Sequence, residues 1–160
     1  MSAPAGIAEI AYREVSSTVL RGGYEYWSGR KGGRPFPSRR DFDPMVEIPR
    51  LARSMMLLDV SHDPLDFRYR LIGTSVREHL GGDLTGRRWS EIEFQRAPNP
   101  IWLHHQWVVE NRQPRFVRPN YIGPHRSFML VESAVLPLGD DDDRVDMLML
   151  FVDFRSKIER

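Results

Sequence analysis

The sequence contains no cysteine among its 160 residues. This absence excludes disulfide bonds, zinc–thiolate sites, iron–sulfur clusters and a thiol nucleophile. A chain without disulfides fits a reducing compartment, so we expect a cytoplasmic location.

Long apolar runs and an excess of charge of either sign are also missing. No run approaches the roughly 18–20 residues that span a bilayer, and residues 1–6 lack the basic and apolar regions of a signal peptide. The formal net charge of +1 gives no reason to expect nucleic acid or a membrane as a partner. With 41% hydrophobic and 28% charged residues, the composition is that of an ordinary globular protein.

The first 40 residues predict an extension before the main domain. Apolar residues at near-helical spacing predict a helix over residues 7–28, which either packs on its own domain or forms a dimer with a second copy. Gly22-Gly23 weakens the middle of this helix. Residues 29–40, rich in glycine, proline and arginine, predict a solvated connection. We therefore divide the chain into residues 1–40, a domain over 41–155, and a tail over 156–160.

The stretch from residue 54 to residue 92 predicts a hairpin followed by short helices. Residues 54–60 form an apolar run, and Phe67, Tyr69 and Leu71 alternate with arginines and isoleucine as in a half-buried strand. Thr74 is a good helix N-cap, and Gly81-Gly82 ends the helix that follows. Before residue 54, Pro49 should divide a helix into two short turns.

The second half of the chain predicts one longer helix and a three-stranded meander. Asn99-Pro100 opens the helix, which runs to about residue 112. The strands are expected over residues 115–122, 126–138 and 144–154, with turns at Gly123-Pro124 and at the acidic residues 140–143. The last strand is apolar on both faces and should be central in the sheet, and the acidic run is a solvated tip rather than a metal site.

Three motifs carry a resemblance to a known family: Pro37-Ser38-Arg39 with Asp43-Pro44, Tyr69-Arg70-Leu71-Ile72-Gly73-Thr74, and Gly81-x-Asp83-Leu84-Thr85-Gly86-Arg87. With the order of elements, they make the chain resemble a PAS domain, within a bacterial family of small stand-alone PAS proteins of unassigned function. The resemblance implies an α+β fold: a five-stranded antiparallel sheet with helices on one face, here with an N-terminal helical extension. It implies a sensory or interaction module and no catalytic mechanism.

The resemblance also implies how such a module works. A small ligand would lie between sheet and helices. About six residues follow the last strand, so we expect no output domain, and signalling through a separate signalling protein or through assembly as a homodimer. By alternation, the candidate cavity residues are Tyr69, Leu71, Trp102, His105, Phe116, Arg118, Met129 and Val131. Arg118 is the informative residue, because a covered arginine requires an anion from a side chain or a ligand.

The histidines make haem a weak hypothesis. His104 and His105 are adjacent on the predicted helix, so they cannot form the i, i+4 pair of zinc helices. Either could be a single axial haem ligand, since haem-bound PAS sensors take a histidine from this region. The absent cysteine disfavours a covalent flavin photosensor, and a noncovalent flavin has no support in the sequence, so the cofactor stays unknown.

Two alternatives to a ligand-binding sensor remain open. One is a small enzyme: Asp59, Glu132 and His105 could converge in a cavity for acid–base chemistry, and a similar order of elements fits the cone-shaped α+β fold of steroid isomerases, which needs a buried aspartate in its pocket. Nothing resembles a nucleophile elbow or a phosphate loop. The other is a protein-interaction module with a filled core and no ligand.

Overall fold

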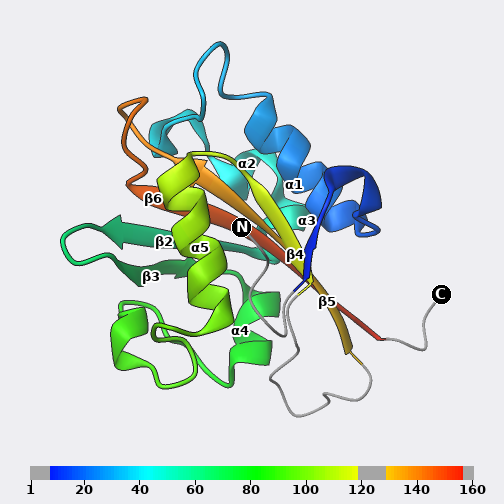
Figure 1. Cartoon of the computed structure of the whole chain (residues 1–160). Helices are drawn as coiled ribbons and strands as arrows, with labels where there is room; N and C mark the ends of the chain where they lie inside the picture. The colour runs from blue at the N-terminus through cyan, green and yellow to red at the C-terminus, as the bar shows by residue number, and fades with distance from the viewer. Residues whose placement is uncertain (1–7, 119–128, 157–160) are drawn as a thin grey trace.

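The computed structural model of the protein describes residues 8–118 and 129–156, with only the backbone of Met129 and Ser156. At its centre is a six-stranded antiparallel sheet in the order β1-β4-β5-β6-β2-β3 (Figure 1). The predicted α+β class is confirmed, with one strand more than expected. The strands are β1 (Ala8–Ile10), β2 (Met55–Ser61), β3 (Asp66–Ile72), β4 (Arg115–Arg118), β5 (Met129–Leu138) and β6 (Met147–Ser156).

The strand β6 lies inside the sheet, between β5 and β2. Leu148 and Leu150 point to one face of the sheet, Met149 and Phe151 to the other, and all four are buried. A strand covered on both faces needs apolar residues at successive positions. The prediction that this strand is central is therefore confirmed.

Helices cover both faces of the sheet. The helix α1 (Thr18–Ser28) lies on the face that carries Phe151, where a Cβ added to Gly23 would come within 2.4 Å of the phenyl ring. Beside α1 lie α2 (Pro44–Glu47) and α3 (Pro49–Ala52), divided by Pro49 as predicted. We call this side the α1 face.

The opposite side, the α5 face, is covered by α4 (Thr74–Leu80), the 3-10 turn η3 (Trp89–Glu91) and α5 (Pro100–Asn111) (Figure 1). Phe67 of β3 packs against Trp89 and Trp102 there, with ring centroids 5.2 and 5.0 Å apart. These are the helices that the family resemblance implied. The α1 layer on the other face is the segment that the sequence suggested to be an extension.

The segment before α1 is not helical. The helix begins only at Thr18, because the Ser17 hydroxyl accepts a hydrogen bond from the Leu20 amide and caps it. Upstream, Ala8–Ile10 pairs with β4 as the sixth strand, and Tyr12–Glu14 forms a 3-10 turn. The predicted helix over residues 7–28 was therefore wrong for residues 8–17, since side-chain periodicity does not reveal a sheet edge that offers backbone hydrogen bonds.

The apolar stripe of this region is buried in its own chain. Val15, Leu20 and Trp27 are at most 1% exposed and share one hydrophobic core with β5 and β6. The Trp27 indole nitrogen also donates to the Pro137 carbonyl, at 2.9 Å. The homodimer stays a prediction. A charged residue at Val15 would damage the fold itself, so such a substitution cannot test whether two chains associate.

The basic connection and the acidic hairpin tip, both predicted to be solvated, contact each other. Arg34 donates to Asp142 and to the Gly139 carbonyl, each at 2.8 Å, and Arg40 lies 3.9 Å from Asp140. Opposite charges far apart in sequence thus meet at one end of the sheet.

Some features predicted from the sequence lie on residues that the structure does not describe. The turn at Gly123-Pro124 lies outside the described residues, as do the adjoining ends of the strands predicted over 115–122 and 126–138. No helix within the two described ranges has the length and apolar content needed to cross a membrane.

Candidate functional site

The eight predicted cavity residues are divided between the two faces of the sheet. Tyr69 and Val131 lie on the α5 face, under the helix that carries Trp102 and His105. Leu71, Phe116 and Arg118 lie on the α1 face, and the side chain of Met129 is outside the described residues. The eight therefore do not line one common space.

An irregularity between β2 and β3 separates Leu71 from Tyr69. Leu58 pairs with Tyr69, but the preceding residue, Leu57, pairs with Leu71, so Arg70 is an extra residue. An extra residue in one strand reverses the faces of all residues beyond it. The alternation of Phe67, Tyr69 and Leu71 on one face, expected from the sequence, was therefore wrong at Leu71.

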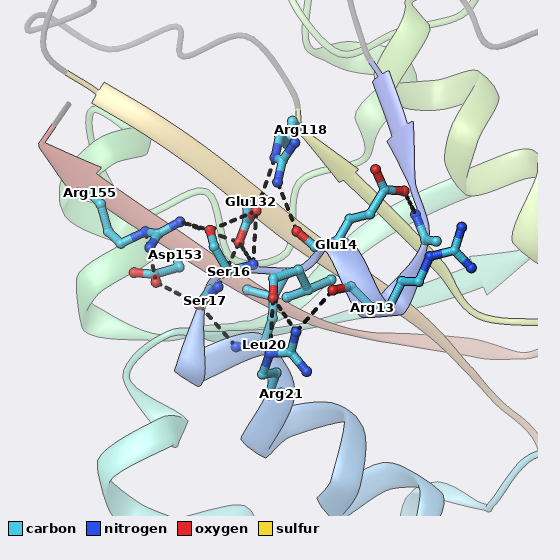
Figure 2. A network of polar contacts seen from close by, with 12 residues as sticks. Arg13, Glu14, Ser16, Ser17, Leu20, Arg21, Arg118, Glu132, Asp153 and Arg155 are labelled. Carbon is cyan, nitrogen blue, oxygen red and sulfur yellow. Dashed lines mark hydrogen bonds and ion pairs between the residues drawn. The ribbon is translucent and has the colours of Figure 1, made fainter. Parts of the chain in front are cut away.

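The anion that pairs with Arg118 is a side chain of the same protein, Glu132. The Glu132 carboxylate is fully buried on the α1 face and accepts from Arg118 Nε at 3.0 Å and from the Ser17 amide at 2.8 Å (Figure 2). Arg155 lies 3.4 Å from the same carboxylate. Burial alone would raise the pKa of Glu132, but Arg118 and the serine donors outweigh it and lower this pKa, so the carboxylate is ionised at neutral pH. Groups of the chain itself therefore satisfy the Glu132 carboxylate.

The three residues of the acid–base hypothesis do not meet. Glu132 and Asp59 lie on the α1 face, whereas His105 lies on α5 across the sheet. Asp59 is paired with Arg68 at 2.9 Å. The convergence of these three residues is therefore contradicted by the strand register.

Beneath α5, aromatic rings surround the His105 imidazole. Its centroid lies 4.7 Å from that of the Trp89 ring and 5.8 Å from that of Phe67. Tyr69 continues the group, with its ring 5.9 Å from Trp89. The elements β3, η3 and α5 therefore meet at this point.

The protonation state of His105 is fixed by its surroundings. Nδ1 lies 2.8 Å from the Ile101 carbonyl, which can only accept, so Nδ1 carries the proton. Burial lowers the pKa of His105 to about 4, with His104 acting in the same direction and the Ile101 contact opposing it. The ring is neutral at pH 7, and Nε2 presents a lone pair.

Four buried polar atoms in this region make no hydrogen bond of good geometry within the described residues: Tyr69 Oη, Trp89 Nε1, Gln95 Oε1 and His105 Nε2. The residues that carry them are at most 5% exposed. Burial raises the pKa of the Tyr69 hydroxyl, and hydrogen-bonding contacts with the Gln95 and Trp89 side chains oppose the rise. We call these four residues the buried polar cluster.

An unsatisfied buried polar group costs about 1–3 kcal/mol, and native proteins contain few of them. Four together indicate a place where water or a polar ligand supplies the missing partners. The sequence indicated Tyr69 and His105 as cavity residues but did not indicate Trp89. It missed Gln95, which lies in an irregular segment without a periodic signal.

Haem does not fit this arrangement. His105 Nε2 is a suitable ligand atom, but the Trp89 and Phe67 rings at 4.7 and 5.8 Å pack against the imidazole where a porphyrin would need space. His104 turns instead to Arg115, whose Nη1 lies 3.1 Å from its Nδ1. No group of three potential metal ligands occurs in the part of the chain that the structure describes.

Comparison with known proteins agrees with this architecture. A family model described as PAS domain matches residues 15–149, from just before α1 into β6. No curated protein and no solved structure gave a match. Because the family match covers most of the chain, including both helical layers and four of the six strands in full, the chain belongs to the PAS domain family of sensory and interaction modules, which generally lack enzymatic activity.

Proposed function

We propose that this protein is a sensory module that binds a small, neutral, polar molecule at the buried polar cluster. The single observation that carries the proposal is the set of four buried polar atoms without well-formed hydrogen bonds, at the meeting point of β3, η3 and α5. The module would pass its signal to a separate protein or to a second copy of itself.

The cluster restricts the chemistry of its ligand. Trp89 Nε1 can only donate, the lone pair on His105 Nε2 and Gln95 Oε1 can only accept, and the Tyr69 hydroxyl can do both. The environment keeps Tyr69 and His105 neutral at pH 7, so the cluster offers no net charge to an ion. A matching ligand is uncharged and carries adjacent donors and acceptors, as an amide, a urea or a nitrogen heterocycle does.

A thermal-shift screen of such neutral compounds against the full chain tests the proposal. A ligand present at one hundred times its Kd adds about 2.7 kcal/mol, which is a rise in Tm of roughly 5–10 °C for a domain of this size. The response should disappear in Tyr69→Phe and His105→Leu. Tyr26→Phe is the matched control, because that hydroxyl donates to Glu47 on the opposite side of the sheet.

The substitution Tyr69→Phe also separates an occupied cluster from an empty one. If a bound molecule forms a hydrogen bond with the Tyr69 hydroxyl, removal of this hydroxyl lowers the Tm of the protein as purified. If the core is filled and dry, removing an unpartnered hydroxyl leaves the Tm unchanged or raises it, and the interaction module without a ligand becomes the better account.

A further inference from the structure

The first described residues form a strap, residues 8–17, which is attached to both faces of the sheet. On the α1 face, the amides of Ser16 and Ser17 donate to Glu132, at 3.2 and 2.8 Å. On the α5 face, Glu9 of β1 lies 3.3 Å from Arg115 Nε. Within β1 itself only Ile10 is buried, so the strand contributes little apolar contact. Polar attachments with little burial characterise segments that open locally.

Arg115 is the residue that joins the strap to α5. Its side chain is 8% exposed, and its guanidinium carbon lies 3.8 Å from the centroid of the Trp107 ring. Nη1 lies 3.1 Å from His104 Nδ1. A guanidinium only donates, so His104 Nδ1 accepts, which makes the His104 ring neutral with its proton on Nε2. One buried cation thus contacts a carboxylate from β1 and two side chains from α5.

The two adjacent histidines connect Arg115 with the buried polar cluster, because one contacts Arg115 and the other belongs to the cluster. His105 faces the aromatic rings of the buried polar cluster, and His104 faces Arg115. A helix is stiff over neighbouring residues, so a shift of α5 that moves His105 also moves His104. The distance from His104 to Arg115 would then change, and with it the environment of Glu9.

We propose that Arg115 couples the buried polar cluster to the strap, so that a change at His105 alters how firmly β1 is held on β4, and release of β1 alters α5 in return. This regulation rests on the proposed function, because it makes the strap the output of that site. Equilibrium coupling is reciprocal, so the effect must be measurable from either end.

Hydrogen exchange followed by mass spectrometry on the full chain tests the coupling without any ligand. Glu9→Gln perturbs the strap, and His105→Leu perturbs the cluster. We expect His105→Leu to raise the exchange of residues 8–14 about fivefold or more, and Glu9→Gln to do the same for α5. Glu14→Gln is the matched control, since that carboxylate accepts from the Ala11 amide within the strap and should affect exchange only there.

Arg115→Lys identifies the route. Lysine keeps the charge opposite Glu9 and the fold, but it cannot also reproduce the planar contacts with His104 and Trp107. In this background, His105→Leu should no longer affect residues 8–14. Exchange that changes only around each substitution overturns the proposal, and coupling that survives Arg115→Lys overturns the role of Arg115. A failed ligand screen with intact coupling would contradict the proposed function alone.

Discussion

At the residue scale, two neighbouring imidazoles on α5 hold opposite tautomers. His104 accepts through Nδ1 from Arg115, whereas His105 donates through Nδ1 to the Ile101 carbonyl. Both assignments follow from partners that can act in one way only. The sequence showed that the two side chains diverge, but it could not show what each of them meets.

Burial of His105 predicts a loss of stability in mild acid. Its pKa is about 4 in the folded chain, against 6.5 when unfolded. Between these values the unfolded chain binds a proton that the folded chain does not, so the free energy of unfolding falls as the pH drops from 6.5 towards 4, by about 3 kcal/mol in total. Urea denaturation across this range should show a shallower dependence in His105→Leu. An unchanged slope in His105→Leu would show that another group causes the acid sensitivity.

Glu132 predicts a second effect, at lower pH and with a different variant. Its pKa is lowered in the folded chain from the usual 4.5, so its contribution is complete above that value and is lost as the pH falls below it. Glu132→Gln should cost about 3 kcal/mol at neutral pH, because it leaves Arg118 without its carboxylate and removes one of the two carboxylates beside Arg155. Arg118→Gln should cost less in urea denaturation, since that side chain is 37% exposed. Equal losses would contradict the central place of the carboxylate.

At the element scale, the close contact between α1 and β6 depends on a glycine, because any side chain at this position would collide with β6. Gly23 was expected to weaken the helix, but a Cβ there would lie 2.4 Å from the Phe151 ring. Gly23→Ala should therefore destabilise the protein by about 1–3 kcal/mol through overpacking, despite a gain of about 1 kcal/mol in helix propensity.

Gly22→Ala is the matched control for this substitution. An added Cβ at Gly22 meets only the tip of Leu51, at 3.0 Å, and this flexible side chain can move. Thermal unfolding should place Gly22→Ala well above Gly23→Ala in Tm. The reverse order would mean that helix propensity, rather than close packing on β6, decides stability here.

Elements marked by local signals could be predicted, and those decided by distant partners could not. The Asn99 cap, the division at Pro49 and the stop at Gly81 each depend on a residue beside the feature itself. The strand β1 depends on the edge of β4, more than one hundred residues away. The position of Leu71 on the α1 face, opposite to that of Tyr69, depends on the irregular pairing between β2 and β3.

At the scale of the whole molecule, the sheet is enclosed by two helical layers with different polar content. On the α1 face the chain itself supplies the partners of the Glu132 carboxylate, and the α5 face contains the buried polar cluster. The family resemblance led us to expect a ligand between the sheet and its helices. Tyr69 and His105 lie together on the α5 face, but the sequence could not separate them from Phe116 and Arg118, because strand register sets the face of each residue.

A native mass spectrum of the full chain, purified from cells without added ligand, shows whether the buried polar cluster holds a small molecule. We expect a population heavier than the polypeptide by one neutral small molecule, and we expect its loss in a protein that combines Tyr69→Phe with His105→Leu. The masses of the bare chain alone, unchanged by these substitutions, would contradict the claim that the buried polar cluster holds a ligand.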